Sequence, residues 1–180
     1  MSIQKSVLFA VLMIGIATPG NGQSNKKFEV FGSVGAVYYS GSGANMDYGG
    51  GFGFRPYGTK SNWMRGWELE FNLSVTNLTE QTSYKPTQTH YTANVLYHFL
   101  SRRVQPYVLI GAGGSYEPGD SNPPPHGAAY LSVNRFLANA GGGLRIAFND
   151  RWSIRPEYRG FDVSHGDNFE RFAVYLGYHF

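Results

Sequence analysis

The stretch RFAVYLGYHF, residues 171–180, decides the fold class of this chain. Large apolar side chains occupy every second position, and small, polar or amphipathic residues fill the positions between them. A period of two sustained over this stretch predicts a β-strand whose two faces lie in different environments. Because terminal residues usually fray, an aromatic end of this kind implies that something keeps it ordered. The apolar series is Phe172, Val174, Leu176, Tyr178 and Phe180.

The opposite end of the chain has the three-part pattern of a secretory signal peptide. Lys5 precedes an apolar run over residues 7–17, and small turn-forming residues follow. The run is too short for a comfortable transmembrane helix. We expect cleavage after Gly22, which leaves residues 1–22 as the signal and 23–180 as one mature domain; cleavage after Ala17 and an uncleaved anchor are the alternatives. The sequence has no cysteine, so a disulfide framework and a lipidated cysteine are excluded.

The composition favours a fold made of strands. The chain has 24 glycines, 13 tyrosines and 13 phenylalanines, with a mean hydropathy of −0.30. Beyond the signal, no apolar run is long enough for a membrane helix, and no apolar pattern has helical spacing. A formal net charge of +3 does not indicate nucleic-acid binding. Alternating segments predict eight strands, at 28–39, 48–57, 65–75, 90–99, 105–116, 136–148, 152–162 and 169–180.

The connections between these strands alternate in character. The first, third, fifth and seventh are rich in Gly, Pro, Ser, Thr and Asn, and two of them, 76–89 and 117–135, are long. The second, fourth and sixth are shorter on average. This alternation is typical of an up-and-down outer-membrane barrel, with short periplasmic turns, longer extracellular loops and both termini periplasmic. A lipocalin-like soluble barrel would also have eight strands, so the position of the apolar face must discriminate between them.

The third predicted strand shows which face is apolar. Trp67, Leu69 and Phe71 alternate with Glu68 and Glu70, so one face is aromatic and aliphatic while the other is charged. Trp and Tyr are the side chains expected at membrane–water boundaries, because an apolar ring and a polar tip fit there together. We therefore expect the apolar face to contact lipid, rather than the core of a soluble sandwich. The aromatic residues near the predicted periplasmic ends are Trp63, Trp67, Tyr97, Phe99, Trp152, Tyr178 and Phe180.

Three segments carry a resemblance to a known family. PYVLIGAGGSY (106–116), NAGGGLRIAFNDRWSIRPEYRGFDV (139–163) and FAVYLGYHF (172–180) resemble strands of the small outer-membrane β-barrel superfamily, which includes opacity-type adhesins and the transmembrane domain of outer membrane protein A. The resemblance covers nearly all of residues 23–180. It implies an all-β, eight-stranded antiparallel barrel in the cell outer membrane, contacts with outer-membrane lipid, and handling by periplasmic chaperones and the barrel-assembly machinery. The terminal apolar series, from Phe172 to Phe180, matches the assembly signal of that superfamily.

An eight-stranded barrel leaves an interior just wide enough for side chains to fill it. Because buried unpaired charge is expensive, charged residues on the inward positions should form Arg–carboxylate bridges that plug the lumen and prevent large conductance. The predicted lumenal charge network is Arg55, Glu68, Glu70, Arg145, Arg155, Glu157, Arg159 and Arg171.

Turn positions also predict parts of the strand register. A hairpin centred between residues 61 and 62 sets Arg55 opposite Glu68. A three-residue turn at 149–151 sets Gly143 opposite Glu157, which leaves room for that carboxylate. The fifth strand leaves two registers open, with either Tyr107 and Leu109 or Val108 and Ile110 facing inward.

The histidines do not indicate a metal site. We expect His126 and His165, together with His90 at the first position of the predicted strand 90–99, to lie on loops, and His98 and His179 to lie in the lumen near the periplasmic end. No pair of them has metal-ligand spacing. The glycine-rich stretches lack the Lys and the strand-to-helix context of a phosphate-binding loop. We therefore expect no metal and no cofactor.

One enzymatic alternative is a lipid A deacylase, a class found among eight-stranded outer-membrane barrels. Its triad would need Ser164 and His165 with Glu157 or Glu170. The order Ser-His departs from the His-x-Ser-Asn pattern of that family, and adjacent strand residues point to opposite faces. We therefore expect a structural or adhesin-like protein that is not an enzyme, with a possible surface ligand at 76–89 and 117–135. A small porin is the remaining alternative.

Overall fold

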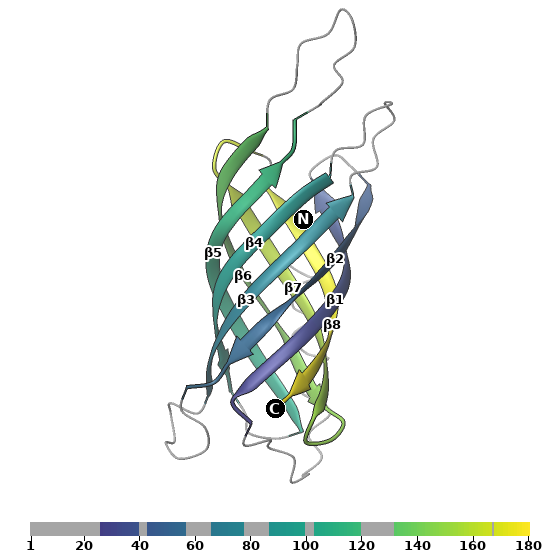
Figure 1. Ribbon diagram of the computed structural model, residues 1–180, viewed down its shortest axis with the longest axis vertical. Helices are drawn as coiled ribbons and strands as arrows, with labels where there is room; N and C mark the ends of the chain where they lie inside the picture. The colour runs from purple at the N-terminus through teal and green to yellow at the C-terminus, as the bar shows by residue number, and fades with distance from the viewer. Residues whose placement is uncertain are drawn as a thin grey trace, which may run out of the picture.

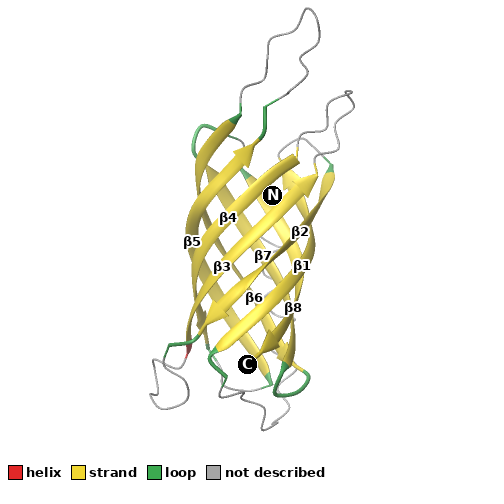
Figure 2. Cartoon of the chain, viewed as in Figure 1, coloured by secondary structure: helices red, strands yellow, loops and turns green. Residues whose placement is uncertain are grey.

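The chain forms a closed barrel of eight antiparallel strands in sequence order, with β8 paired to β1 (Figure 1). The computed structural model describes residues 26–39, 43–56, 66–77, 87–99, 103–119, 132–166 and 168–180; the predicted signal peptide, Trp63 and His126 lie outside them. The described chain is almost entirely strand (Figure 2). Within it, no helix has the length and apolarity to cross a membrane. The strands are β1 Phe28–Tyr39, β2 Ala44–Phe54, β3 Trp67–Asn77, β4 Thr87–His98, β5 Val104–Glu117, β6 Val133–Ala147, β7 Trp152–Val163 and β8 Phe169–His179.

The predicted number and order of strands are confirmed, and the largest boundary error concerns β2. That strand begins at Ala44, inside a stretch interpreted as a turn, because Ala44 already pairs with Tyr38 of β1. The other strands also extend into the predicted long loops, since Thr87 pairs with Asn77 and Val133 with Glu117. The predicted long loops are therefore reduced to 78–86 and 118–132, called the long connections below, which join strands at the end opposite to the start of β1 and the end of β8 (Figure 1). The β2–β3 connection at the other end spans 55–66, which is longer than the predicted turn.

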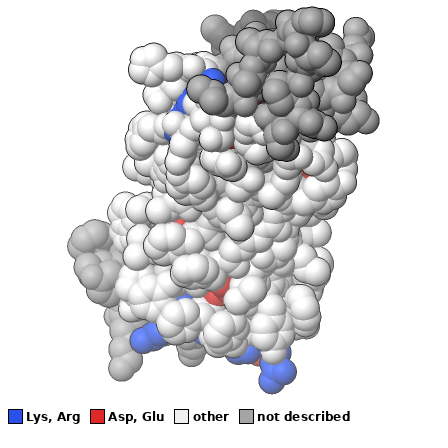
Figure 3. Space-filling view, turned by 45° about the horizontal axis from the view of Figure 1, so that its top comes forward, with Lys and Arg blue, Asp and Glu red and all other residues white. Residues whose placement is uncertain are grey.

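The barrel wall has its apolar side outward and its polar side inward. In β3, Leu73 is 54% exposed and Phe71 48% exposed, whereas Glu70 is fully buried. A soluble barrel would show the reverse arrangement, because its apolar residues fill the interior. Lys, Arg, Asp and Glu are sparse on the wall seen in Figure 3. The fold is that of a transmembrane barrel, in which closure pairs every strand edge and the outer face contacts lipid.

Aromatic rings gather at the end where β1 begins and β8 ends. Trp67 packs against Tyr97 with ring centroids 5.2 Å apart, and Trp152 packs against Tyr178 at 5.0 Å. The first and last strands meet here as well, since Phe28 and Phe180 exchange backbone hydrogen bonds and their rings stack at 6.0 Å. These pairs form a belt of the kind that lies at a membrane–water boundary.

The structure decides the register of the fifth strand. Tyr107 and Leu109 face inward and are 2% exposed each, whereas Ile110 is 66% exposed. Both faces of this stretch are apolar, so its own pattern is ambiguous. Its orientation follows from the lumen, where the Tyr107 hydroxyl donates a hydrogen bond of 2.7 Å to Glu157. The predicted pairing of Gly143 with Glu157 is confirmed.

Two glycines make room for lumenal carboxylates. A Cβ atom at Gly53 would lie 2.7 Å from Oε1 of Glu68, and one at Gly177 would clash with Oε1 of Glu29. Since the interior of an eight-stranded barrel is close to full, a methyl group at either position would displace a charged side chain from its partners. Glycine in these strands therefore serves the packing of the charged interior.

Replacing Leu73 by Arg should lower the free energy of unfolding by about 2–4 kcal/mol, because the side chain points from mid-strand into lipid. The measurement is urea unfolding of the protein refolded in phospholipid vesicles. Leu73→Ala is the matched control, since it shortens the same side chain without adding charge. Equal losses for the two variants would contradict a lipid-facing position.

Candidate functional site: the charged lumen

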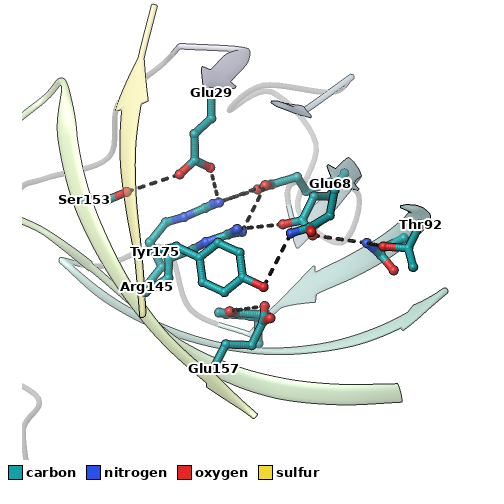
Figure 4. A network of polar contacts seen from close by, with 12 residues as sticks. Glu29, Glu68, Thr92, Arg145, Ser153, Glu157 and Tyr175 are labelled. Carbon is teal, nitrogen blue, oxygen red and sulfur yellow. Dashed lines mark hydrogen bonds and ion pairs between the residues drawn. The ribbon is translucent and has the colours of Figure 1, made fainter. Parts of the chain in front are cut away.

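Oppositely charged side chains approach one another from opposite walls of the barrel. Most of the carboxylates come from β1, β2 and β3, and most of the arginines from β6, β7 and β8. Their pairing therefore crosses the lumen instead of following one wall, as the close view shows for Arg145 and Glu68 (Figure 4). In the deep lumen of the described chain the carboxylates are Glu29, Asp47, Glu68, Glu70 and Glu157, and the arginines are Arg55, Arg145, Arg155, Arg159 and Arg171.

Glu68 is the centre of the group nearest to the aromatic belt. It accepts hydrogen bonds from Arg55 Nε at 2.8 Å and from both terminal nitrogens of Arg145, at 2.6 and 2.8 Å. His98 Nε2 lies 3.1 Å from the same carboxylate. Arg145 also bonds Glu29 on β1. Arg145 thus bridges two strands across the lumen with charge-assisted hydrogen bonds, which are stronger than those between neutral groups.

A second group lies at mid-barrel around Glu70. Its two oxygens accept hydrogen bonds from Arg155 Nη2 at 2.6 Å and from Arg159 Nη2 at 2.7 Å. Arg159 also holds Glu157, whose Oε2 atom lies 3.0 Å from Arg159 Nη2 and 2.7 Å from the Tyr107 hydroxyl. Each carboxylate has at least two donors, which is the condition under which a buried ion pair is tolerated.

Arg155 connects the two groups and is clamped between aromatic rings. Its guanidinium carbon lies 4.8 Å from the ring centroid of Phe31 and 4.7 Å from that of Tyr175. Its Nη1 atom lies 3.8 Å from Glu68, while its Nη2 atom bonds Glu70. Cation–π contacts of this kind strengthen when water is excluded, so the rings hold the guanidinium across the lumen.

Arg171 forms a third group, closer to the long connections. It bonds Asp47 at 3.3 Å and the Ser74 hydroxyl at 3.1 Å, and it contacts the Tyr175 hydroxyl. Asp47 also accepts a hydrogen bond of 2.9 Å from Thr76. This group lies at the end of the polar interior that is nearer to the long connections.

An apolar cap covers the polar groups toward the long connections. Phe161 and Phe169 stack with centroids 4.4 Å apart, and the His90 ring packs at a tilt against Phe169, with centroids 4.9 Å apart. The prediction that His90 lies on a loop is wrong, because β4 begins at Thr87 and turns His90 inward, where it is 3% exposed. His165 is exposed in the β7–β8 turn with φ of 56°. The cap consists of Val37, Leu137, Phe161, Val163 and Phe169.

All eight residues predicted for the lumenal network face the interior, but sequence reasoning missed Glu29 and Asp47. The predicted set holds five arginines against three carboxylates, and this charge imbalance indicates that further acidic residues face the lumen. Glu29 alternates with Phe31 on the inward face of β1, and Asp47 follows the inward Asn45 on β2. Both acids come from β1 and β2, where glycines interrupt the alternation of polar and apolar residues.

The residues of the hydrolase alternative lie in three different places: a turn, the lumen and the outward face of the wall. Ser164 and His165 lie in the exposed β7–β8 turn. Glu157 is buried in the lumen against Arg159. Glu170 lies on the outward side of β8, where the Tyr158 hydroxyl bonds it. Within the described residues, no three His, Cys, Asp or Glu side chains are placed to hold a metal ion.

The terminal apolar series lies on the lipid side of β8. Leu176 is 52% exposed, Phe172 42% and Phe180 58%, whereas the alternate residues Ala173 and Tyr175 are buried in the lumen. β8 pairs along its length with β1 and with β7, so this strand closes the barrel.

The closed sheet, the outward apolar wall and the ion-paired lumen define a small transmembrane β-barrel. The model of the outer membrane protein beta-barrel domain matches residues 7–180, and the chain belongs to this family of outer-membrane proteins. The search of curated proteins gave no match.

Several solved structures share the fold. Neisserial surface protein A is similar with a TM-score of 0.66 and 13% identity, over 89% of this chain and 100% of that one. Ail, the attachment invasion locus protein of Yersinia pestis, gives 0.57 and 15%, over 86% and 97%. The outer membrane enzyme PagL gives 0.52 and 16%, over 83% and 97%. At these identities the similarity establishes the fold alone.

Replacing Glu68 by Gln should lower the free energy of unfolding by about 3–5 kcal/mol, because Arg55 loses its carboxylate partner and the buried Arg145 keeps Glu29 alone. Glu117→Gln is the matched control. Glu117 meets Arg135 at 3.5 Å with both side chains about one-third exposed, so its loss should cost less than about 1 kcal/mol. Urea unfolding in vesicles measures both, and similar losses would contradict the central role of Glu68.

Proposed function

We propose that this chain is a non-enzymatic outer-membrane protein that interacts with partners outside the cell through its long connections. The filled lumen is the observation that carries this proposal. Ion pairs cross it at three levels, and the apolar cap around Phe161 and Phe169 covers them. A transport role would need an open path, so the surface at the ends of the barrel is the better place for function.

The composition of the two long connections supports a particular chemistry of contact. Residues 78–86 contain one Lys and one Glu, and 118–132 contain Asp120 and neither Lys nor Arg. Thr, Ser, Asn, Gln, Tyr and Pro make up much of the rest. Ail has been solved in complex with the heparin analogue sucrose octasulfate. The few cations here do not favour such a polyanion, so we propose that hydrogen bonds to a neutral surface dominate.

The positions of the candidate hydrolase residues support a non-enzymatic role. A general base must lie within hydrogen-bond reach of the nucleophile, and a third group must orient it. The Glu157 carboxylate is engaged by Arg159 and Tyr107 inside the barrel, on the far side of the wall from a lipid substrate. This arrangement supports Ser164 and His165 as turn residues.

The purified monomer should show no large, stable conductance in planar bilayers, because the lumen of the described barrel is crossed by buried ion pairs. A sixteen-stranded porin measured in the same bilayers provides the positive control. Steady porin-sized current steps from the monomer would contradict the plugged lumen and favour a transport role.

Deleting residues 118–127 should abolish adherence of expressing cells to epithelial monolayers while leaving barrel assembly intact, because the deletion removes only part of a connection between strands. Assembly is measured by heat-modifiable mobility on gels. The matched control for loop length replaces the same ten residues, PGDSNPPPHG, by a Gly-Ser repeat of equal length.

Two outcomes would contradict the proposal. If adherence survived both the deletion and the replacement, the connection 118–132 would have no role in binding. Release of acyl chains from lipid A by the intact protein, lost in Ser164→Ala, would show that the chain is an enzyme.

A further inference from the structure

A basic arc lies on the rim of the barrel at the end that carries the aromatic belt. Lys and Arg gather at the lower rim in Figure 3, in contrast to the wall above it. The members of the basic arc are Lys26, Lys27, Arg103 and Arg151. These residues lie at the rim of the barrel, outside its strands, and the proposed function does not explain them.

Contacts join the members of the basic arc around the rim. Lys26 Nζ donates a hydrogen bond of 3.0 Å to the carbonyl of His179, and the His179 N–H donates one of 2.7 Å to the carbonyl of Arg151. On the next hairpin, Arg103 donates to the carbonyls of Ala147 at 2.9 Å and Phe148 at 3.4 Å. The arc therefore runs from β1 past β8 and the β6–β7 turn to the start of β5.

The arc lies directly beside exposed aromatic rings, which fixes its depth. Lys27 precedes Phe28, and Arg151 precedes Trp152; these rings are 47% and 42% exposed. Arg103 is bonded to Phe148, whose ring is 53% exposed. Since such rings lie at the level of lipid headgroups, the adjoining cations lie at the level of the phosphates.

The charges on the outside of the described barrel are unevenly distributed between its two ends. At the end with the basic arc, Asp150 is the one described acidic side chain outside the lumen. At the opposite end lie Glu117, Asp162 and Glu170, with Arg135 paired to Glu117. Attraction to an anionic surface is therefore stronger at the rim with the basic arc, and it falls off within a Debye length.

We propose that the basic arc binds the phosphate headgroups of anionic phospholipids in the leaflet at this end of the barrel. The start of β1, the end of β8 and the short β4–β5 and β6–β7 turns lie here, so in this family of barrels it is the periplasmic leaflet. The two carbonyl contacts of Arg103 hold its guanidinium in place, which reduces the entropy lost when a phosphate binds. A carbohydrate polymer of the cell wall would not need cations at the level of the aromatic belt.

The test compares headgroup selectivity of purified full-length protein in nanodiscs that contain phosphatidylglycerol and phosphatidylcholine, with retained lipids counted by native mass spectrometry. The protein should retain phosphatidylglycerol with a preference of about tenfold or more, since each cation near an anionic surface contributes roughly fivefold. K27Q/R151Q should lose most of this preference. Salt at about 0.5 M NaCl should abolish it, because salt screens interactions between exposed charges. These two positions avoid the structural contacts of the Arg103 side chain.

The matched control is K85Q/R135Q, which removes one cation from the 78–86 connection and one from the start of β6, both at the opposite end of the barrel, and it should keep the preference. An equal loss in both double variants would attribute the selectivity to net charge and overturn the proposal. The proposal would also be overturned if the intact protein showed no headgroup preference, or if K27Q/R151Q kept the preference unchanged. Displacement of the lipid by millimolar inorganic phosphate would identify a small-anion site instead. Heat-modifiable mobility confirms that every variant has assembled.

Discussion

Electrical neutrality of a narrow, closed interior is the constraint on which the rest of this structure depends. A barrel that spans lipid must pair every strand edge, and closing eight strands leaves a lumen no wider than its own side chains. A charged side chain in this lumen is shielded from bulk water, so its desolvation is costly, and each arginine needs a carboxylate within hydrogen-bond reach. Glu68, with Arg55 and Arg145 around it, shows how completely this demand is met.

The same constraint governs the small residues and the strand register. A carboxylate that reaches across the lumen needs space on the wall behind it, which Gly53 provides for Glu68 and Gly177 for Glu29. Because the bridges join β3 to β6 and β7, a shift of one strand by a single residue would break several of them and turn charged side chains into lipid. The ion pairs therefore specify the register as well as filling the interior.

The two ends of the barrel differ because they face different surroundings. Toward the long connections the polar interior ends beneath the packed rings of Phe161, Phe169 and His90, and acidic residues lie on the outside. At the other end an aromatic belt adjoins Lys27 and Arg151. This asymmetry belongs to the surface of the barrel, and the shared fold leaves it free to vary, which is why similarity of fold alone does not assign a function.

The sequence by itself determined the number and order of the strands and, where polar and apolar residues alternate clearly, the face that meets lipid, because side-chain direction alternates within a strand and needs no knowledge of its neighbours. It also determined that Arg55 lies next to Glu68, since a hairpin turn sets the register locally. Only the tertiary structure decided that Glu29 and Asp47 join the network, that Tyr107 points inward from a stretch apolar on both faces, and that His90 belongs to the cap. These choices depend on partners from strands distant in the chain, and such partners are identified only when the barrel closes and the charges must balance.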